Sequence, residues 1–114
     1  MTSPTDASIP VFQRELDPLL LLPMRLFVLC LLADVRWHEE GALARRLRVS
    51  SPVLTPHIDR LLAAGYVARH ERHRSLLRLT ELGFERLTGH VTAFQRVACR
   101  AANLVASQRA GPIR

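Results

Sequence analysis

The sequence has few cysteines and no uninterrupted apolar run long enough to cross a membrane. Its two cysteines, Cys30 and Cys99, are far apart, which argues against a disulfide framework and favours a reduced compartment. The longest apolar stretch, residues 19–33, is interrupted by Pro23 and Arg25 and is shorter than a bilayer requires. No secretory signal is visible. We therefore expect a cytoplasmic protein without membrane partners, in which this stretch is a buried core helix.

The motifs of catalysis and metal binding are also missing. The sequence has no nucleophile elbow, no glycine loop for phosphate and no paired carboxylates of the kind that acid–base catalysis uses. Four histidines show no spacing to cysteine or carboxylate that would define a metal site: His38, His70, His73 and His90. We expect neither an enzyme nor a cofactor.

Lysine is absent as well, and all sixteen basic residues are arginine, which codon usage alone can explain. The formal charge is +6, and residues 36–78 carry +5 of it when arginines are counted against Asp and Glu. Concentrated positive charge favours a polyanionic partner, because each neutralised phosphate releases counterions. The length and the 48% hydrophobic content predict one domain over residues 9–107, between a flexible tail (1–8) and a frayed end (108–114).

Residues 49–66 predict a short capped helix followed by a strand. Ser51 is a good N-cap, Pro52 suits the first helical position, and Gly65 supplies the left-handed residue that ends a helix. Apolar residues recur at helical spacing and predict one buried stripe: Leu54, Ile58 and Leu61.

This stretch resembles the recognition helix of winged helix-turn-helix repressors. The resemblance lies in Ser51, Pro52, Leu54, Thr55, Pro56, His57 and Ile58, closed by the "LLAAGYV" of residues 61–67. Pro56 stands where the family usually carries Lys or Arg, and it removes a charge and an intrahelical hydrogen bond. Either the helix bends there, or it begins at Pro56 with Thr55 as its cap. Both alternatives weaken the expectation that this turn reads bases directly.

The segments before this helix fit the same family. A short helix is plausible within residues 9–22, and "LDPLLLLPMRLFVLCLLAD" resembles the first helix of winged-helix regulators, which we expect from Pro23 to about Asp34. Residues 35–38 predict a connecting strand. Residues 40–47 predict a helix with Leu43, Ala44 and Leu47 inward. Arg48 then occupies a position that is often a left-handed glycine, at a cost of roughly 1 kcal/mol.

Residues 66–70 and 75–80 alternate as a two-stranded hairpin, which would be the wing. We expect Val67, Leu77 and Leu79 inward, and Arg69 and Arg78 outward. The "RLTxxG" of residues 78–83 resembles the motif that closes the wing in this superfamily, with Thr80 capping the last helix.

That last helix, about residues 81–107 with Gly89 a weak point, carries apolar residues in alternating steps of three and four. They predict a dimerisation seam: Phe84, Leu87, Val91, Phe94, Ala98, Ala101 and Val105. The alternative is a helix folded back over its own core. We favour the dimer, since two-fold homodimers are common.

The resemblance to MarR- and ArsR-like regulators implies a mainly α (α+β) winged helix-turn-helix fold and a homodimer that binds double-stranded DNA. The recognition helix (about 51–64) would enter the major groove, and the wing (about 66–80) would lie on the backbone or minor groove. The candidate DNA contacts are Ser50, Ser51, Val53, Thr55 and Arg60, with Arg45, Arg46, Arg48, Arg72 and Arg74 positioning the protein. Each arginine has a simpler alternative, a solvated surface charge.

Three other readings remain open. The same fold can bind a protein instead of DNA, and Pro56 is the best argument for that alternative. An unknown small-molecule effector between the first and last helices is possible. Cys99 is either a redox-sensitive thiol beside Arg96 or Arg100, or a small buried apolar residue. His57 is expected to be half-buried and hydrogen-bonded.

Overall fold

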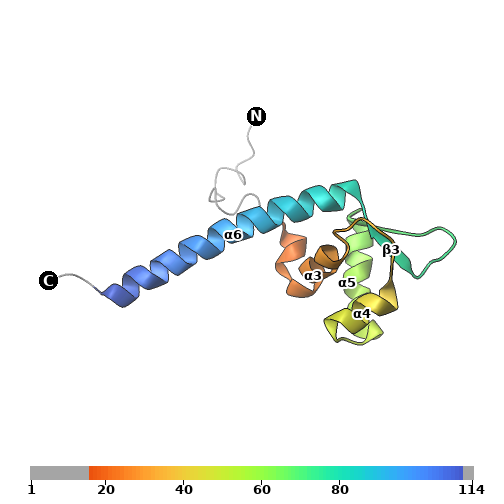
Figure 1. Cartoon of the computed structure of the whole chain (residues 1–114), viewed down its shortest axis with the longest axis horizontal. Helices are drawn as coiled ribbons and strands as arrows, with labels where there is room; N and C mark the ends of the chain where they lie inside the picture. Colours follow the sequence, from red (N-terminus) through yellow and green to blue (C-terminus); the bar gives the residue numbers. More distant parts are fainter. Residues whose placement is uncertain (1–15, 112–114) are drawn as a thin grey trace. The chain divides into compact units, whose positions relative to one another are not determined.

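The computed structural model describes residues 16–111, which divide between two compact units. Residues 17–88 form one unit, and residues 89–111 belong to the other. The expected tail (1–8), residues 9–15 of the expected N-terminal helix and residues 112–114 lie outside the described part. The elements follow in the order η1 (Pro18–Leu21), α3 (Pro23–Leu31), β1 (His38–Glu39), α4 (Glu40–Leu47), α5 (Ser51–Ala63), β2 (Val67–Arg69), β3 (Leu76–Leu79) and α6 (Glu81–Ala110) (Figure 1).

Three helices and a small sheet enclose the core of residues 17–88. α3 contacts both α4 and α5, and α5 also contacts β2. The predicted stripe of α5 is fully buried at Leu54, Ile58 and Leu61, because its helical spacing places all three on one face. Helices α3 and α4, with the residue that caps the end of α3, complete this core with four further buried leucine and valine side chains: Val28, Leu29, Leu32 and Leu43.

The sheet is antiparallel, with the strand order β1-β3-β2. β2 and β3 form the predicted wing, in which Val67 pairs with Leu79 and Arg69 with Leu77. Val67, Leu77 and Leu79 are buried as expected, because alternate residues of a strand face the same side. The predicted mainly α winged helix-turn-helix fold is confirmed, with a long final helix.

The connecting strand was predicted over residues 35–38 but is found at His38–Glu39. Val35 has a φ of 55°, in the left-handed region, so it cannot continue as extended backbone. The Asp34 carboxylate closes this loop, since it accepts a hydrogen bond from the Arg36 amide at 3.1 Å and lies 2.8 Å from His38 Nε2. These hydrogen bonds, that of His38 first, lower the pKa of Asp34. Because Asp34 belongs to this loop, α3 ends at Leu31 and not at about Asp34, the end predicted from the sequence.

The helix-turn-helix is formed as predicted, with one shift. α4 has its predicted bounds, and Arg48 has φ 57° and ψ 42°, the left-handed conformation expected there. α5 begins at Ser51 with Ser50 as the N-cap, so the prediction of Ser51 as cap was wrong by one residue. The helix continues through Pro56, so the alternative start at Pro56 was also wrong.

Thr80 caps α6, as predicted. Its hydroxyl accepts a hydrogen bond from the Gly83 amide at 3.0 Å and donates one to the Gly65 carbonyl at 2.6 Å. Gly83 is required here, because a Cβ atom at this position would overlap the Tyr66 carbonyl. α6 then runs without a break through Gly89 to Ala110. Residues 108–110, expected to fray, are therefore helical.

Asp17 and Tyr66 connect the start of this unit to the end of the helix-turn-helix. The Tyr66 hydroxyl donates a buried hydrogen bond of 2.5 Å to Asp17 Oδ2, while Asp17 Oδ1 accepts one from the Leu19 amide at 2.9 Å. Burial, and next the bond to Asp17, raise the pKa of Tyr66 to about 12. This pair therefore fixes η1 against the segment that follows α5.

None of the helices described here is both long enough and apolar enough to span a membrane.

Candidate nucleic-acid interface

The outward face of α5 is exposed, and its first half carries no charge. Pro52, Val53 and Pro56 are all exposed, Val53 to 51%. Ser50 and Ser51, at the start of the helix, are exposed too. Asp59 and Arg60 follow on the same side, one turn later. Of the predicted contacts in this region, Ser50, Ser51, Val53 and Arg60 are therefore open to a partner.

Thr55 differs from these residues because its hydroxyl is already engaged. It is half-buried, and its Oγ1 atom donates to the Ser51 carbonyl at 2.8 Å. The same hydroxyl lies 3.3 Å from Glu40 Oε2, so its single hydrogen is shared between two acceptors. Threonine commonly bonds to the carbonyl four residues earlier in a helix. Thr55 thus faces the wing side of α5.

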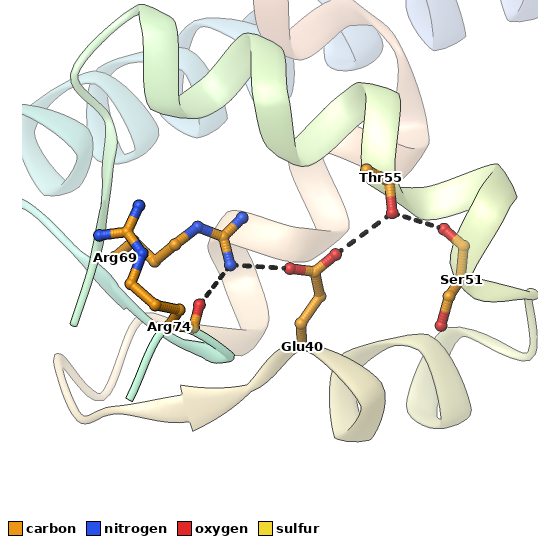
Figure 2. Close-up of polar contacts among 5 residues, drawn as sticks. All are labelled: Glu40, Ser51, Thr55, Arg69 and Arg74. Carbon is orange, nitrogen blue, oxygen red and sulfur yellow. Dashed lines mark hydrogen bonds and ion pairs between the residues drawn. The ribbon is translucent and has the colours of Figure 1, made fainter. Parts of the chain in front are cut away.

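Glu40 is the centre of this polar network, which Figure 2 shows. Its Oε1 atom accepts a charged hydrogen bond from Arg69 Nη1 at 3.1 Å, and both side chains are only about one-fifth exposed. The same Arg69 nitrogen donates to the Arg74 carbonyl, and the Glu40 amide donates to the Ser75 carbonyl at 2.8 Å. Glu40, at the start of α4, therefore connects the recognition helix to both ends of the wing loop.

Arg69 was predicted to point outward, and that prediction was wrong. Because alternate residues of a strand share a side, Arg69 lies on the side of the buried Val67, but this pattern gives no hint of the carboxylate that it meets. Glu40 lies 29 residues away in sequence. Sequence spacing alone could not find this pair, because no local motif relates the two positions.

The arginines predicted to position the protein are all exposed. They lie on α4, in the turn after it and at the tip of the wing: Arg45, Arg46, Arg48, Arg72 and Arg74. Arg60 lies on α5 itself, beyond its uncharged first half, and is exposed as well. Within the described residues, none of these six guanidinium groups has an ion pair with a carboxylate.

A further cation is held in place by an aromatic ring. The Arg78 guanidinium carbon lies 4.4 Å from the centre of the Trp37 ring, a cation–π distance. Trp37 in turn meets the ring of His70 edge-on at 4.9 Å. His70 Nδ1 accepts hydrogen bonds from the Arg72 and His73 amides, both at 3.1 Å. This cluster shapes the wing tip, and the sequence analysis did not identify it.

His57 packs as predicted. It is half-buried, and its Nδ1 atom accepts a hydrogen bond from Arg25 Nε of α3 at 3.2 Å. Accepting at Nδ1 requires the neutral ring with its hydrogen on Nε2. His57 therefore fastens α5 to α3 and is not directed at a ligand.

Most of the apolar residues of α6 predicted as a seam are exposed in the single chain. Within residues 89–111, Phe94 is exposed to 48% and Val105 to 59%, and Ala98 and Ala101 are exposed as well. Val91 is half-buried. In residues 17–88, Phe84 is exposed to 43%, whereas Leu87 is exposed to only 5%.

Both cysteines are exposed. Of the two alternatives for Cys99, the buried apolar residue was therefore wrong, and Cys99 lies beside Arg96 and Arg100 in a shallow groove of α6. Partial burial of its sulfur raises the pKa of the Cys30 thiol, which disfavours the reactive thiolate. Across residues 16–111, no group of three or more His, Cys, Asp or Glu side chains is placed to hold a metal ion.

Solved structures of several transcriptional regulators share this fold. A transcriptional regulator homologue from Pyrococcus horikoshii OT3 superimposes with a TM-score of 0.66 and 22% identity, over 73% of this chain and 87% of the other. BldR from Sulfolobus solfataricus superimposes with a TM-score of 0.60 and 20% identity, over 90% of this chain and 86% of BldR. A MarR-family regulator from Silicibacter pomeroyi superimposes with a TM-score of 0.53 and 21% identity, over 90% of this chain and 81% of the regulator.

The MarR family model matches residues 23–75, from the first residue of α3 to the tip of the wing. The resemblance to winged helix-turn-helix regulators is therefore confirmed, and MarR is the family that this segment matches. No curated protein sequence matches the chain.

Proposed function

We propose that this chain is a sequence-specific, DNA-binding transcriptional regulator of the cytoplasm that acts as a homodimer. α5 enters the major groove, and the wing of β2 and β3 lies along the adjacent backbone or minor groove. The observation that carries this proposal is the exposed face of α5 between exposed arginines. Such a face, with cations on both sides, is complementary to a groove bordered by phosphates.

The roles of the side chains follow from their positions. Arg45, Arg46 and Arg48 lie on one side of α5 and Arg72 and Arg74 at the wing tip, so these arginines neutralise phosphates and set the orientation. Ser50 and Ser51 are close enough to the helix start to donate to phosphate or to a base edge. Arg60 is the charged candidate for a contact further along the groove.

The exposed apolar residues of α6 support the dimer. Phe94, Leu104 and Val105 are each about half exposed, although large apolar side chains on a soluble helix are usually covered. The exposed seam residues Phe94, Ala98, Ala101 and Val105 are spaced by steps of three and four, as in helices packed side by side. A second copy of α6 would bury these residues.

The proposal is tested by titrating fluorescent duplex DNA from upstream of the chain's own gene at 50 and 200 mM salt. We expect affinity to fall by at least tenfold over this range, since several phosphates are contacted. Arg72→Gln combined with Arg74→Gln should weaken binding at 50 mM and reduce the salt slope. The matched control is Arg100→Gln with Arg109→Gln, which removes the same charge from α6. Binding that is absent at both salt concentrations would refute DNA binding.

The second candidate function is a winged-helix module that binds a protein. The uncharged first half of α5, with Pro56 in place of a basic residue, favours it. Replacing Arg60, Arg72 and Arg74 by glutamine separates the two candidates. Loss of DNA affinity with unchanged dimerisation supports the DNA-binding regulator, and unchanged DNA affinity supports the protein-binding module.

A further inference from the structure

We infer that α5 reads its DNA site mainly through the C5-methyl groups of thymine, which Val53 and Pro56 contact in the major groove. This inference rests on the proposed DNA binding and goes beyond it, since it names the base and the chemical group that determine specificity.

The first half of α5 presents an uncharged and mainly apolar face. Major-groove helices place the residues of their N-terminal half against base edges. Here that half shows Pro52, Val53 and Pro56, all exposed, and two of them have rigid apolar rings. Residues 50–59 include no arginine, lysine, asparagine or glutamine, the side chains that form paired hydrogen bonds with guanine or adenine.

Two polar side chains in the first half of α5, Thr55 and His57, are hydrogen-bonded within the protein. The Thr55 hydroxyl is shared between the Ser51 carbonyl and Glu40. The Nδ1 atom of His57 accepts from Arg25. Asp59 is exposed, but its carboxylate is repelled by the phosphates. Hydrogen-bonded base reading is therefore left to the two serines at the helix start, to Nε2 of the half-buried His57 and to Arg60 beyond the uncharged region.

An apolar protein face distinguishes thymine from the other three bases. Of the four bases, only thymine presents a methyl group in the major groove, and apolar side chains recognise it by direct contact. Covering a methyl group removes apolar surface from water, which is worth about threefold to fivefold in affinity. A cytosine or purine at the same position offers polar groups that Val53 and Pro56 cannot satisfy. Such a face therefore selects thymine.

The charges around the face suit this partner. Exposed arginines lie on α4, in the following turn and at the wing tip, whereas residues 50–58 carry no formal charge. A duplex has the complementary arrangement, with phosphates along both edges of a groove whose floor, at A·T pairs, carries methyl groups. A protein partner would need acidic side chains in two bands around an apolar strip.

The experiment begins with selection of bound sequences from a pool of duplexes that contain 30 randomised base pairs. The best sequence is then synthesised with thymine replaced by deoxyuridine at one position at a time, which removes only the methyl group. Affinities are measured by fluorescence anisotropy. We expect one or two positions in each half-site to lose about threefold to fivefold, and 5-methylcytosine opposite guanine at those positions to recover part of the loss relative to cytosine.

Two variants assign the effect to side chains. In Val53→Ala, the ratio of thymine to deoxyuridine affinity should approach one at one position, and in Pro56→Ala at its neighbour. Arg45→Gln is the matched control, which should lower all affinities and keep the ratio. Binding that is tight but indifferent to deoxyuridine everywhere overturns this inference and leaves DNA binding intact. A ratio unchanged in both variants overturns the assignment to Val53 and Pro56. A pool that yields no bound sequence refutes the proposed function itself.

Discussion

Residues 17–88 and residues 89–111 differ in whether their apolar side chains form a core. In the first unit Leu54, Ile58 and Leu61 are completely buried, although Phe27, Val53 and Phe84 are about half exposed. In the second, Phe94, Leu104 and Val105 are about half exposed on a regular helix. The first unit therefore has a packed core of its own, whereas the second leaves Phe94, Leu104 and Val105 exposed in the single chain. The proposed dimer would cover these residues.

The largest expected effect comes from a matched pair of leucine substitutions, one in each unit. Leu61→Ala should lower the free energy of unfolding by about 2–5 kcal/mol, because it leaves a cavity in a fully packed site. Leu104→Ala removes the same atoms from an exposed position. We expect it to change unfolding of the monomer by less than about 0.5 kcal/mol and to weaken dimerisation. Urea unfolding and sedimentation equilibrium measure the two effects, and equal losses of monomer stability would remove the contrast.

The next effect concerns Tyr66 in the core of the first unit. Tyr66→Phe removes the hydroxyl that donates to Oδ2 of the buried Asp17 carboxylate, which should cost about 1–3 kcal/mol at neutral pH. The pKa of Tyr66 is raised to about 12, above the value of about 10 in an unfolded chain. Its contribution is therefore complete below pH 10 and is lost as the pH rises through 12.

Urea midpoints recorded from pH 9 to pH 12 test this dependence. The decline of the natural protein over that interval should be shallower in Tyr66→Phe. Parallel curves for the two proteins would show that Tyr66 ionisation does not limit alkaline stability.

A smaller effect is expected at Glu40, which holds the wing to the recognition helix. Glu40→Gln removes the charge from the bond with Arg69 and should cost about 1 kcal/mol of stability. It should also reduce DNA affinity severalfold, because the wing is less well positioned. Glu71→Gln, an exposed change of the same kind at the wing tip, is the control and should not weaken DNA binding. If both variants behave alike, the network of Glu40 does not position the wing.

The smallest effect is at Arg48, where an arginine occupies the left-handed conformation. Arg48→Gly should stabilise the chain by up to about 1 kcal/mol, since glycine adopts φ 57° without strain. Arg48→Gln keeps the strain and removes the charge. DNA affinity should fall equally in both variants, and thermal unfolding should distinguish them. Identical melting temperatures would show that the turn is not strained.

Local signals predicted most of the helix-turn-helix and the wing. The bounds of α4, the stripe of α5, the left-handed Arg48 and the Thr80 cap all depend on residues within one or two turns of each other. Predictions failed where a local pattern was overruled. Residues 35–38 have strand propensity, but the hydrogen bonds of Asp34 and the left-handed Val35 form a tight loop there. Among the candidate site residues, the sequence could not show that the Thr55 hydroxyl is already hydrogen-bonded, because one of its acceptors is Glu40, 15 residues away.

The sequence by itself determined the order of the helices and the wing, the buried stripe of α5 and where positive charge collects, because periodicity, caps and charge are properties of neighbouring residues. Only the tertiary structure decided that Arg69 faces Glu40, 29 residues away, and that Tyr66 donates to Asp17, 49 residues away. Such pairs form because folding removes both groups from water, where each must find a partner among whatever side chains the packing brings near.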